Sequence, residues 1–109
     1  MRNNVFRVKW TATARFDLRG IIRFIAIENR TQAKQILHRL QDKAEALATF
    51  PERGRVVPEI RAVGVHTHRE IILNPWRIIY RIEGSTVIVL AVLDGRRELQ
   101  DMLLERLIR

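Results

Sequence analysis

The sequence predicts an α+β domain in which a helical hairpin packs on a mainly antiparallel, four-stranded sheet. Three observations predict this class. Near the N-terminus one alternating segment is followed by two stretches with apolar residues at helical spacing. In the second half, three short segments rich in β-branched residues are separated by turns. The chain has 109 residues, of which 47% are apolar, so residues 1–109 are expected to form one domain around one core.

Seven elements are expected, in the order β-α-α-β-β-β-α. Their ranges are a strand over 5–10, a helix from a cap at Thr11 or Thr13 to about Glu28, a helix from a cap at Thr31 to Phe50, strands over 69–74, 76–82 and 86–93, and a short helix over 97–109.

The N-terminal strand and the helical hairpin follow from a change of hydrophobic period. Residues 5–10 alternate between apolar and polar side chains, whereas the next two segments repeat apolar residues every three or four positions. Asn29 and Arg30 break the helical pattern. Gly20 costs the first helix roughly 1 kcal/mol against alanine. Pro51 ends the second helix, because a residue before proline disfavours helical dihedral angles. Two helices joined so closely form an antiparallel hairpin.

The second half begins with a long loop, over residues 51–68, in which prolines and glycines stand among arginine and glutamate. Loops of this kind often carry function. A meander of three antiparallel strands follows, with turns at Asn74-Pro75 and at residues 83–85. The last strand is apolar on both faces, so it should lie inside the sheet with cover on each side.

The charge of the chain predicts an acidic partner. Its formal net charge is +8, and 17 of its 20 basic residues are arginine, the side chain suited to bidentate contact with carboxylate or phosphate. Residues 1–50 hold ten basic and four acidic side chains, whereas residues 51–109 hold ten and eight. The positive charge is therefore expected mainly in the N-terminal half.

The chain has no cysteine, which excludes a disulfide framework and a thiolate metal site and favours a reducing compartment. No apolar run has the length of a membrane span or the features of a signal peptide. We therefore expect a cytoplasmic protein.

The order of elements and a set of short motifs resemble the RelE/ParE superfamily of bacterial toxin–antitoxin systems. These motifs cover nearly the whole chain and are Trp10-Thr11-x-x-Ala14-x-x-Asp17-Leu18-x-x-Ile21, Phe50-Pro51-x-x-Gly54-Arg55, Pro58-Glu59, Arg69-Glu70-Ile71, Arg77-Ile78-Ile79-Tyr80-Arg81 and Val92-Leu93-x-Gly95-Arg96-Arg97. Each motif is weak alone, but the ordered set is fairly specific.

The resemblance implies one of two activities. RelE-like members cut mRNA on the ribosome, and ParE-like members poison DNA gyrase. RNA cleavage needs a base, an acid and cations that stabilise the phosphorane-like charge. Arg77 and Arg97 match the arginine positions of RelE-like enzymes, but residues 71–73 offer no lysine and Leu103 stands where a tyrosine would serve. Asp94 stands where relatives of both branches often have a histidine. We expect a gyrase-inhibiting, ParE-like toxin with no catalytic residues, which a ParD-type antitoxin silences in a hetero-oligomeric complex.

The resemblance also gives the basic residues of the first helix a partner. Arg15, Arg19 and Arg23 fall on one line with no carboxylate three or four residues away, so an acidic antitoxin segment is expected beside them. The alternative is a solvated face, or neutralisation by carboxylates from elsewhere in the fold. Phe24 and Ile27 add apolar surface beyond the core-facing side and are assigned to the same antitoxin interface. Their alternative is cover by the second helix and the sheet.

Four further arginines are expected to contact the target. Arg77 and Arg81 share one face of a strand, and Arg96 and Arg97 stand at the start of the terminal helix, where cations oppose the helix dipole. Their alternative is internal pairing with carboxylates, which are Asp94, Glu98 and Asp101.

The remaining polar and aromatic candidates carry weaker expectations. His66 and His68 lack a third metal ligand, and His38 can pair with Asp42 on its own helix. No metal or other cofactor is expected. Trp10 and Trp76 are expected in the core or at a hairpin edge rather than in base stacking, which is the alternative. The rival functions are a ribosome-dependent mRNA interferase using Arg77, Arg97, His66 or His68 and Tyr80, and a basic module for binding DNA or RNA. The chain lacks a helix-turn-helix, and direct sequence-specific DNA binding is not expected of it.

Overall fold

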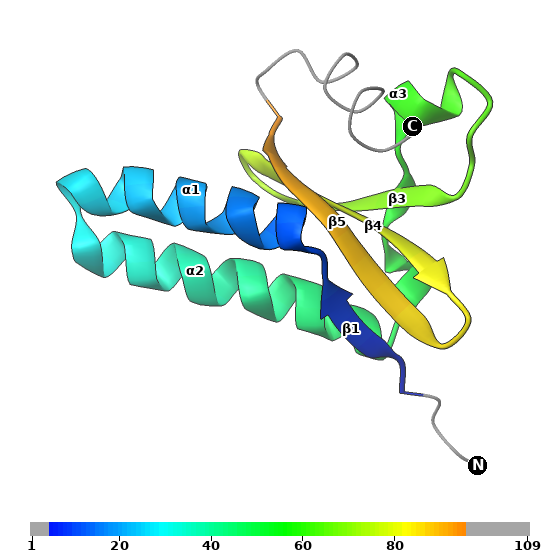
Figure 1. The fold of residues 1–109 in the computed structure, drawn as a ribbon, viewed down its shortest axis with the longest axis horizontal. Helices are drawn as coiled ribbons and strands as arrows, with labels where there is room; N and C mark the ends of the chain where they lie inside the picture. Colours follow the sequence, from blue (N-terminus) through cyan, green and yellow to red (C-terminus); the bar gives the residue numbers. More distant parts are fainter. Residues whose placement is uncertain (1–4, 96–109) are drawn as a thin grey trace.

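The computed structural model of the chain describes residues 5–95. Its elements are β1 (Arg7–Trp10), α1 (Ala12–Glu28), α2 (Arg30–Glu45), η1 (Ala46–Ala48), η2 (Pro51–Arg53), β2 (Arg55–Val56), α3 (Pro58–Arg61), β3 (His68–Leu73), β4 (Trp76–Glu83) and β5 (Thr86–Asp94). Figure 1 shows the α1–α2 hairpin beside one mixed sheet, which confirms the predicted α+β class. The predicted terminal helix over 97–109 lies outside the described residues.

The sheet has five strands where the sequence predicted four. Its order is β1-β5-β4-β3-β2, with β1 parallel to β5 and the other neighbours antiparallel. The additional strand, β2, lies in the predicted loop 51–68 and pairs with β3 through Arg55 and Val56. A strand of two residues is too short to show alternation, so the sequence pattern cannot reveal it. The same loop also holds η2 and α3, which begin at Pro51 and Pro58, where proline suits the first helical position.

The main core lies between the helical hairpin and one face of the sheet. It joins buried side chains of α1, α2 and η1 with those of β3, β4 and β5, among them Leu18, Leu40, Leu47, Ile78 and Tyr80. A second, smaller core covers the opposite face, and its buried members are Val57, Ile60, Ile79, Ala91 and Leu93. The segment predicted as a loop therefore supplies part of the hydrophobic cover of the sheet.

β5 contributes to both cores, and a β-bulge within it changes which of its residues face each core. Val89 belongs to the main core and Ala91 to the second. Across the strand pair, Ile79 lies opposite Ala91 and Tyr80 opposite Val89, so Leu90 is the extra residue of β5. The prediction that this strand is covered on both faces is confirmed.

One residue, Asn29, ends α1 and begins α2. Its backbone N–H donates to the carbonyl of Ile25, and its side-chain oxygen accepts a hydrogen bond from the backbone N–H of Gln32 at 2.9 Å. The predicted cap at Thr31 is therefore wrong, because the chain turns between the helices within a single residue.

The other helix ends differ less from the prediction. Of the two candidate caps for α1, Thr11 is the one used, and its hydroxyl accepts from the N–H of Ala14 at 3.0 Å. α2 ends at Glu45 and continues as η1, short of the predicted end at Phe50. No helix within residues 5–95 has the length and apolar character needed to span a membrane.

Candidate functional site

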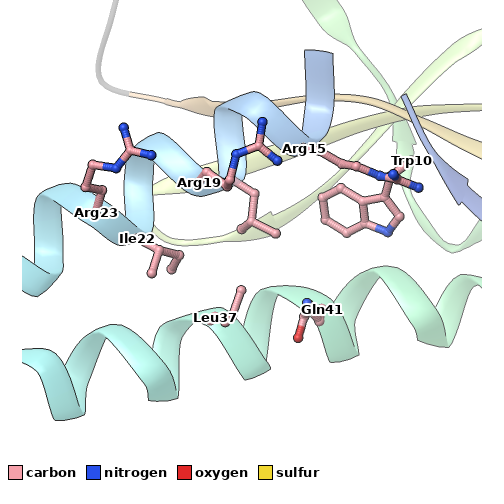
Figure 2. A pocket seen from close by; sticks show the side chains of 8 residues that line it. Trp10, Arg15, Arg19, Ile22, Arg23, Leu37 and Gln41 are labelled. Atoms are coloured by element: carbon pink, nitrogen blue, oxygen red, sulfur yellow. The ribbon is translucent and has the colours of Figure 1, made fainter. Parts of the chain in front are cut away.

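Three arginines form a stripe along the exposed side of α1. Arg15, Arg19 and Arg23 recur every four residues, close to one helical turn, and all three are exposed. Figure 2 shows their side chains projecting from the same stretch of α1, with α2 running beside it. The sequence pattern thus placed these residues on one line, as the structure has them.

A groove with a volume of about 590 Å³ separates this stripe from α2. We call it the basic groove, and its lining residues are Trp10, Arg15, Leu18, Arg19, Ile22, Arg23, Leu37 and Gln41. Leu18 is buried, and Trp10, Ile22 and Leu37 are half-buried. An apolar floor beside a cationic rim can accept an amphipathic helix with an acidic side.

The positive charge of the stripe is not neutralised by the part of the chain that the structure describes. Its ion pairs join Arg55, Arg77 and Arg81 to glutamates and do not reach the stripe. Like charges four residues apart destabilise an isolated helix by about 0.2–0.5 kcal/mol per pair. Neutralisation by carboxylates from elsewhere in the fold therefore has no support within residues 5–95, which leaves water or an anionic partner.

A second strip of α1 is apolar and exposed. Phe16 is 70% exposed, and Phe24 and Ile27 are each 77% exposed. Gly20 lies between the two phenylalanines along the helix, and a Cβ added there would meet no atom within 4 Å. The alternative of cover by α2 and the sheet is wrong for Phe24 and Ile27 as far as the described residues extend. We call Phe16, Gly20, Phe24 and Ile27 the apolar strip.

The apolar strip borders a different groove from the one that the arginines line. This groove lies between α1 and the sheet, where Pro75, Trp76 and Val92 contribute to its lining. The five α1 residues predicted as one partner surface therefore lie on two neighbouring sides of the helix, so a partner that contacts all five has to straddle α1.

Arg77 has its hydrogen-bonding groups turned to two glutamates of the same chain. Its Nε donates to Glu70 Oε1 at 2.5 Å, and its Nη1 and Nη2 donate to the two carboxylate oxygens of Glu59 at 3.0 and 2.8 Å. Glu70 also accepts from Arg55 Nε at 2.6 Å through its other oxygen. The side chains of Glu70 and Arg77 are 0% and 10% exposed. The expectation that Arg77 presents a cation to the target does not match this placement.

The pKa values of this ion-pair network shift in the direction that its contacts require. The hydrogen bonds from Arg77 lower the pKa of Glu59, against the opposing effect of burial. Burial by itself lowers the pKa of Arg77, but the hydrogen bonds to Glu59 and Glu70 outweigh it and raise that pKa. Both groups are charged at neutral pH, so two arginines and two glutamates balance on this face of the sheet.

The glutamates of the network were not assigned to Arg77 from the sequence. The carboxylates predicted as partners of Arg77 were Asp94, Glu98 and Asp101, which follow Arg77 in the chain. Glu59 and Glu70 precede it. The register of the β3–β4 hairpin sets Ile72 opposite Arg77. Glu70 is two residues away from Ile72 and thus on the same face of the sheet, within reach of a long side chain. Counting residues along both strands away from the Asn74-Pro75 turn could have predicted that Glu70 and Arg77 lie close together.

The other predicted target-contact residues are only partly described. Arg81 lies on the same face of β4 as Arg77, its side chain is 39% exposed, and its Nη2 is 3.6 Å from a carboxylate oxygen of Glu83. Arg96 and Arg97 lie outside the described residues. Within residues 5–95, Arg81 is therefore the partly exposed member of this set.

Tyr80 is a buried side chain that holds a neighbouring segment in place by hydrogen bonds. It is fully buried, its hydroxyl donates to the carbonyl of Pro51 at 2.7 Å, and it accepts from the N–H of Gly54 at 2.9 Å. Burial raises the pKa of Tyr80, with a partial opposing effect of the hydrogen bond from Gly54. The phenol thus holds the start of the 51–68 segment against the sheet and is not exposed to a substrate.

The histidines and tryptophans do not gather into one site. His68 is buried, with its Nδ1 3.1 Å from the hydroxyl of Thr67, whereas His66 and His38 are exposed. Within residues 5–95 no three histidine or carboxylate side chains come close enough to hold a metal ion. Trp10 and Trp76 pack against the main core, as predicted.

Comparisons with known proteins agree with one another. Residues 8–99 match the family described as ParE toxin of type II toxin–antitoxin system, parDE. Toxin ParE3 of Caulobacter vibrioides is 32% identical over 94 residues, which are 85% of this chain and 90% of that protein. The chromosomal ParDE system from P. aeruginosa has a chain with a TM-score of 0.67 and 19% identity, covering 84% of this chain and 98% of that one. A chain of the toxin–antitoxin complex RelBE2 from Mycobacterium tuberculosis has a TM-score of 0.63 and 23% identity, covering 85% of this chain and 94% of that one. At these identities the two solved structures are similar in fold.

Proposed function

The chain belongs to the ParE toxin family of type II toxin–antitoxin systems, and from this premise we propose that it inhibits DNA gyrase by protein–protein contact and is silenced by a ParD-type antitoxin. The rival within the same superfamily is cleavage of mRNA on the ribosome. The two activities make different demands on the face of the sheet that carries Arg77.

The ion-pair network of Arg77 is the observation that favours gyrase inhibition by protein–protein contact over mRNA cleavage. A ribonuclease needs a free cation where charge develops on the phosphorane. Here the arginine is 10% exposed and held by Glu59 and Glu70. Two carboxylates beside it would repel an RNA phosphate, so this face is poorly suited to phosphodiester cleavage.

The acid and base that cleavage requires also find no support among the described residues. Tyr80 is buried on the side of the main core and hydrogen-bonded to backbone groups. His68 is buried, and His66 is exposed before β3. A general acid and base must reach the reacting atoms together. Tyr80 belongs to the main core and thus lies on the opposite face of β4 from Arg77, which supports gyrase contact over mRNA cleavage.

The basic groove and the apolar strip are the surfaces we assign to the antitoxin. Arg15, Arg19 and Arg23 offer charge to an acidic segment, and Phe24 and Ile27 offer apolar area next to them. A partner that combines acidic and apolar side chains can bind both the basic groove and the apolar strip. For the target we retain Arg81, Arg96 and Arg97, and we leave out Arg77 because its donors are used inside the chain.

Expression of the chain under tight control in bacterial cells tests the proposal. Plasmid topology and the 5′ ends of transcripts are followed in the same culture, with co-expressed antitoxin as the control. We expect loss of negative supercoiling, transcripts without new codon-specific ends, and reversal of the effect by the antitoxin. Codon-specific cuts on ribosomes with unchanged plasmid topology would instead establish the interferase and overturn the proposal.

A further inference from the structure

The face of the sheet opposite the helical hairpin carries a group of cations near the β4–β5 turn. In this part of β1, β4 and β5 every second side chain packs in or against the main core. The side chains between them point to the opposite face, because side chains alternate along a strand. They include Arg7 and Lys9 of β1, Arg81 of β4 and Ile88 of β5. We call these four residues the sheet patch.

Three residues of the sheet patch lie in one row across neighbouring strands. The strand register sets Lys9 opposite Ile88 on one side of β5 and Arg81 opposite Ile88 on the other. Neighbouring strands are about 4.8 Å apart, so the Cα atoms of the two cations are about 10 Å apart with the isoleucine between them. Arg7 lies in the next row, opposite Thr86. The patch is therefore an apolar side chain with cations around it.

The described chain does not cover the sheet patch. The second core covers the same face of the sheet, but its strand residues, Ile79, Ala91 and Leu93, lie toward the other ends of β4 and β5. Figure 1 shows α3, which belongs to that cover, well away from the β4–β5 turn. Ile88 is half-buried and belongs to neither core. Within residues 5–95 this part of the face is thus open.

The sheet patch also keeps an excess of positive charge. Arg7 and Lys9 are exposed and take part in none of the ion pairs of the described chain. The Arg81 side chain is 39% exposed and lies 3.6 Å from a carboxylate oxygen of the exposed Glu83, and such surface pairs contribute little. The balanced network of Arg77 is four residues away along β4, roughly 13 Å. The patch therefore offers three cations beside one carboxylate.

We propose that the sheet patch is the surface through which the chain contacts its target, and that it binds an acidic surface of gyrase with an apolar side chain at its centre. This inference rests on the proposed function, because the partner is gyrase. Protein interfaces combine a central apolar contact, which carries much of the binding energy, with a polar rim. Ile88 has the central position here, and Arg7, Lys9 and Arg81 form the rim.

The composition of the patch favours an acidic protein over the other possible occupants. Two copies of the chain meeting through this face would bring cations against cations, which is unfavourable. A nucleic acid would find the cations, but Ile88 offers no contact to a phosphate, and Glu83 would repel one. The surfaces assigned to the antitoxin belong to the helical hairpin, which packs on the other face of the sheet.

Inhibition of purified gyrase by a double variant of the patch tests the inference. Ile88→Thr combined with Arg81→Gln removes the apolar centre and one rim charge, and threonine keeps the β-branch that suits a strand. We expect the concentration of toxin that halves supercoiling to rise about tenfold. The matched control is Ile72→Thr with Arg39→Gln, which changes an isoleucine that is 36% exposed on β3 and an exposed arginine of α2. It should stay within about twofold of the wild type.

A second measurement uses the wild-type chain, so that a folding defect of a variant cannot imitate the result. Isoleucine methyl groups are labelled, and saturation transferred from gyrase to the bound toxin is followed by NMR. We expect the signal of Ile88 to lose intensity. The signal of Ile27, which is 77% exposed on α1, should keep its intensity and serves as the internal control.

The outcomes separate this inference from the proposed function. If the wild type inhibits gyrase and the folded double variant inhibits it equally well, the sheet patch is not the contact surface and the proposed function stands. Saturation of Ile27 without saturation of Ile88 leads to the same conclusion. If the double variant instead loses affinity for a DNA duplex in the absence of gyrase, the patch is a nucleic-acid site and the inference is wrong. If the wild type does not inhibit gyrase at all, both fail.

Discussion

Gly54 lies where the chain has no room for a side chain. Its N–H donates to the hydroxyl of Tyr80, and an added Cβ would meet that oxygen at 2.6 Å as well as the backbone oxygen of Glu70. Arg69 Nη1 donates to the carbonyl of Gly54 at 2.6 Å. The start of the 51–68 segment is thus fixed by a close approach of backbone to side chain.

Two glycine substitutions are therefore expected to act in opposite directions. Gly54→Ala should lower the free energy of unfolding by about 2 kcal/mol, because the methyl group displaces Tyr80 or the backbone of β3. Gly20→Ala, in the middle of α1 with open space around it, should raise the free energy of unfolding by about 1 kcal/mol through helix propensity. Urea denaturation measures both. Equal effects of the two variants would contradict this account of Gly54.

Glu59 makes stability depend on pH with a defined sign. Its pKa is lowered from 4.5 in the folded chain, chiefly by the hydrogen bonds from Arg77. Between this lowered pKa and about 4.5 the unfolded chain binds more protons, so the stabilisation is complete above that window and is lost as the pH falls through it. At neutral pH we expect Glu59→Gln to be less stable than the wild type.

The difference between the two proteins should shrink as the pH falls below about 4.5. Urea unfolding from pH 7 to pH 3 follows it, and curves that stay parallel over the whole range would show that Glu59 does not carry this pH dependence.

At the scale of elements, the helical hairpin depends on the cap at Asn29. Asn29→Ala should cost about 1 kcal/mol, because the N–H of Gln32 loses its acceptor at the start of α2. Thr31→Ala removes the hydroxyl of the residue first predicted as the cap, and it should change the free energy of unfolding by less than about 0.5 kcal/mol. A larger effect at Thr31 than at Asn29 would mean that α2 begins later than the structure has it.

The arginine stripe of α1 is expected to contribute to antitoxin binding through its charge. Replacing all three arginines of the stripe by alanine should weaken antitoxin binding by about tenfold at low salt and make the dependence of affinity on salt shallower. The matched control replaces Arg30, Lys34 and Arg39, which are exposed on α2 and do not line the basic groove. Both triple variants change the net charge equally. Indistinguishable affinities for the two would remove the stripe from the interface.

The elements that the sequence predicted well are those with a long periodic signal. α1, α2 and the three meander strands have enough residues to show their period, and the apolar run of β5 predicted cover on both faces. β2 has two residues and α3 has four, too few for any period. The partner of Arg77 was missed because it depends on the register between strands, which no single segment displays.

At the scale of the whole molecule, the two halves of the chain use their charge differently. The arginines of α1 remain unpaired within residues 5–95, whereas Arg55 and Arg77 meet Glu70 and Glu59 on the sheet. The lopsided charge of the sequence thus becomes a cationic hairpin beside a balanced sheet face. The hairpin suits the capture of an acidic partner, and the balanced face is unsuited to cutting a nucleic acid.

The most direct test of this account adds the purified chain in increasing amounts to purified DNA gyrase and relaxed plasmid. We predict that supercoiling is inhibited in proportion to the toxin added, that prior mixing with the antitoxin restores it, and that Glu59→Gln inhibits as the wild type does wherever it is folded. Full supercoiling activity at a large molar excess of folded toxin would show that the chain does not inhibit gyrase.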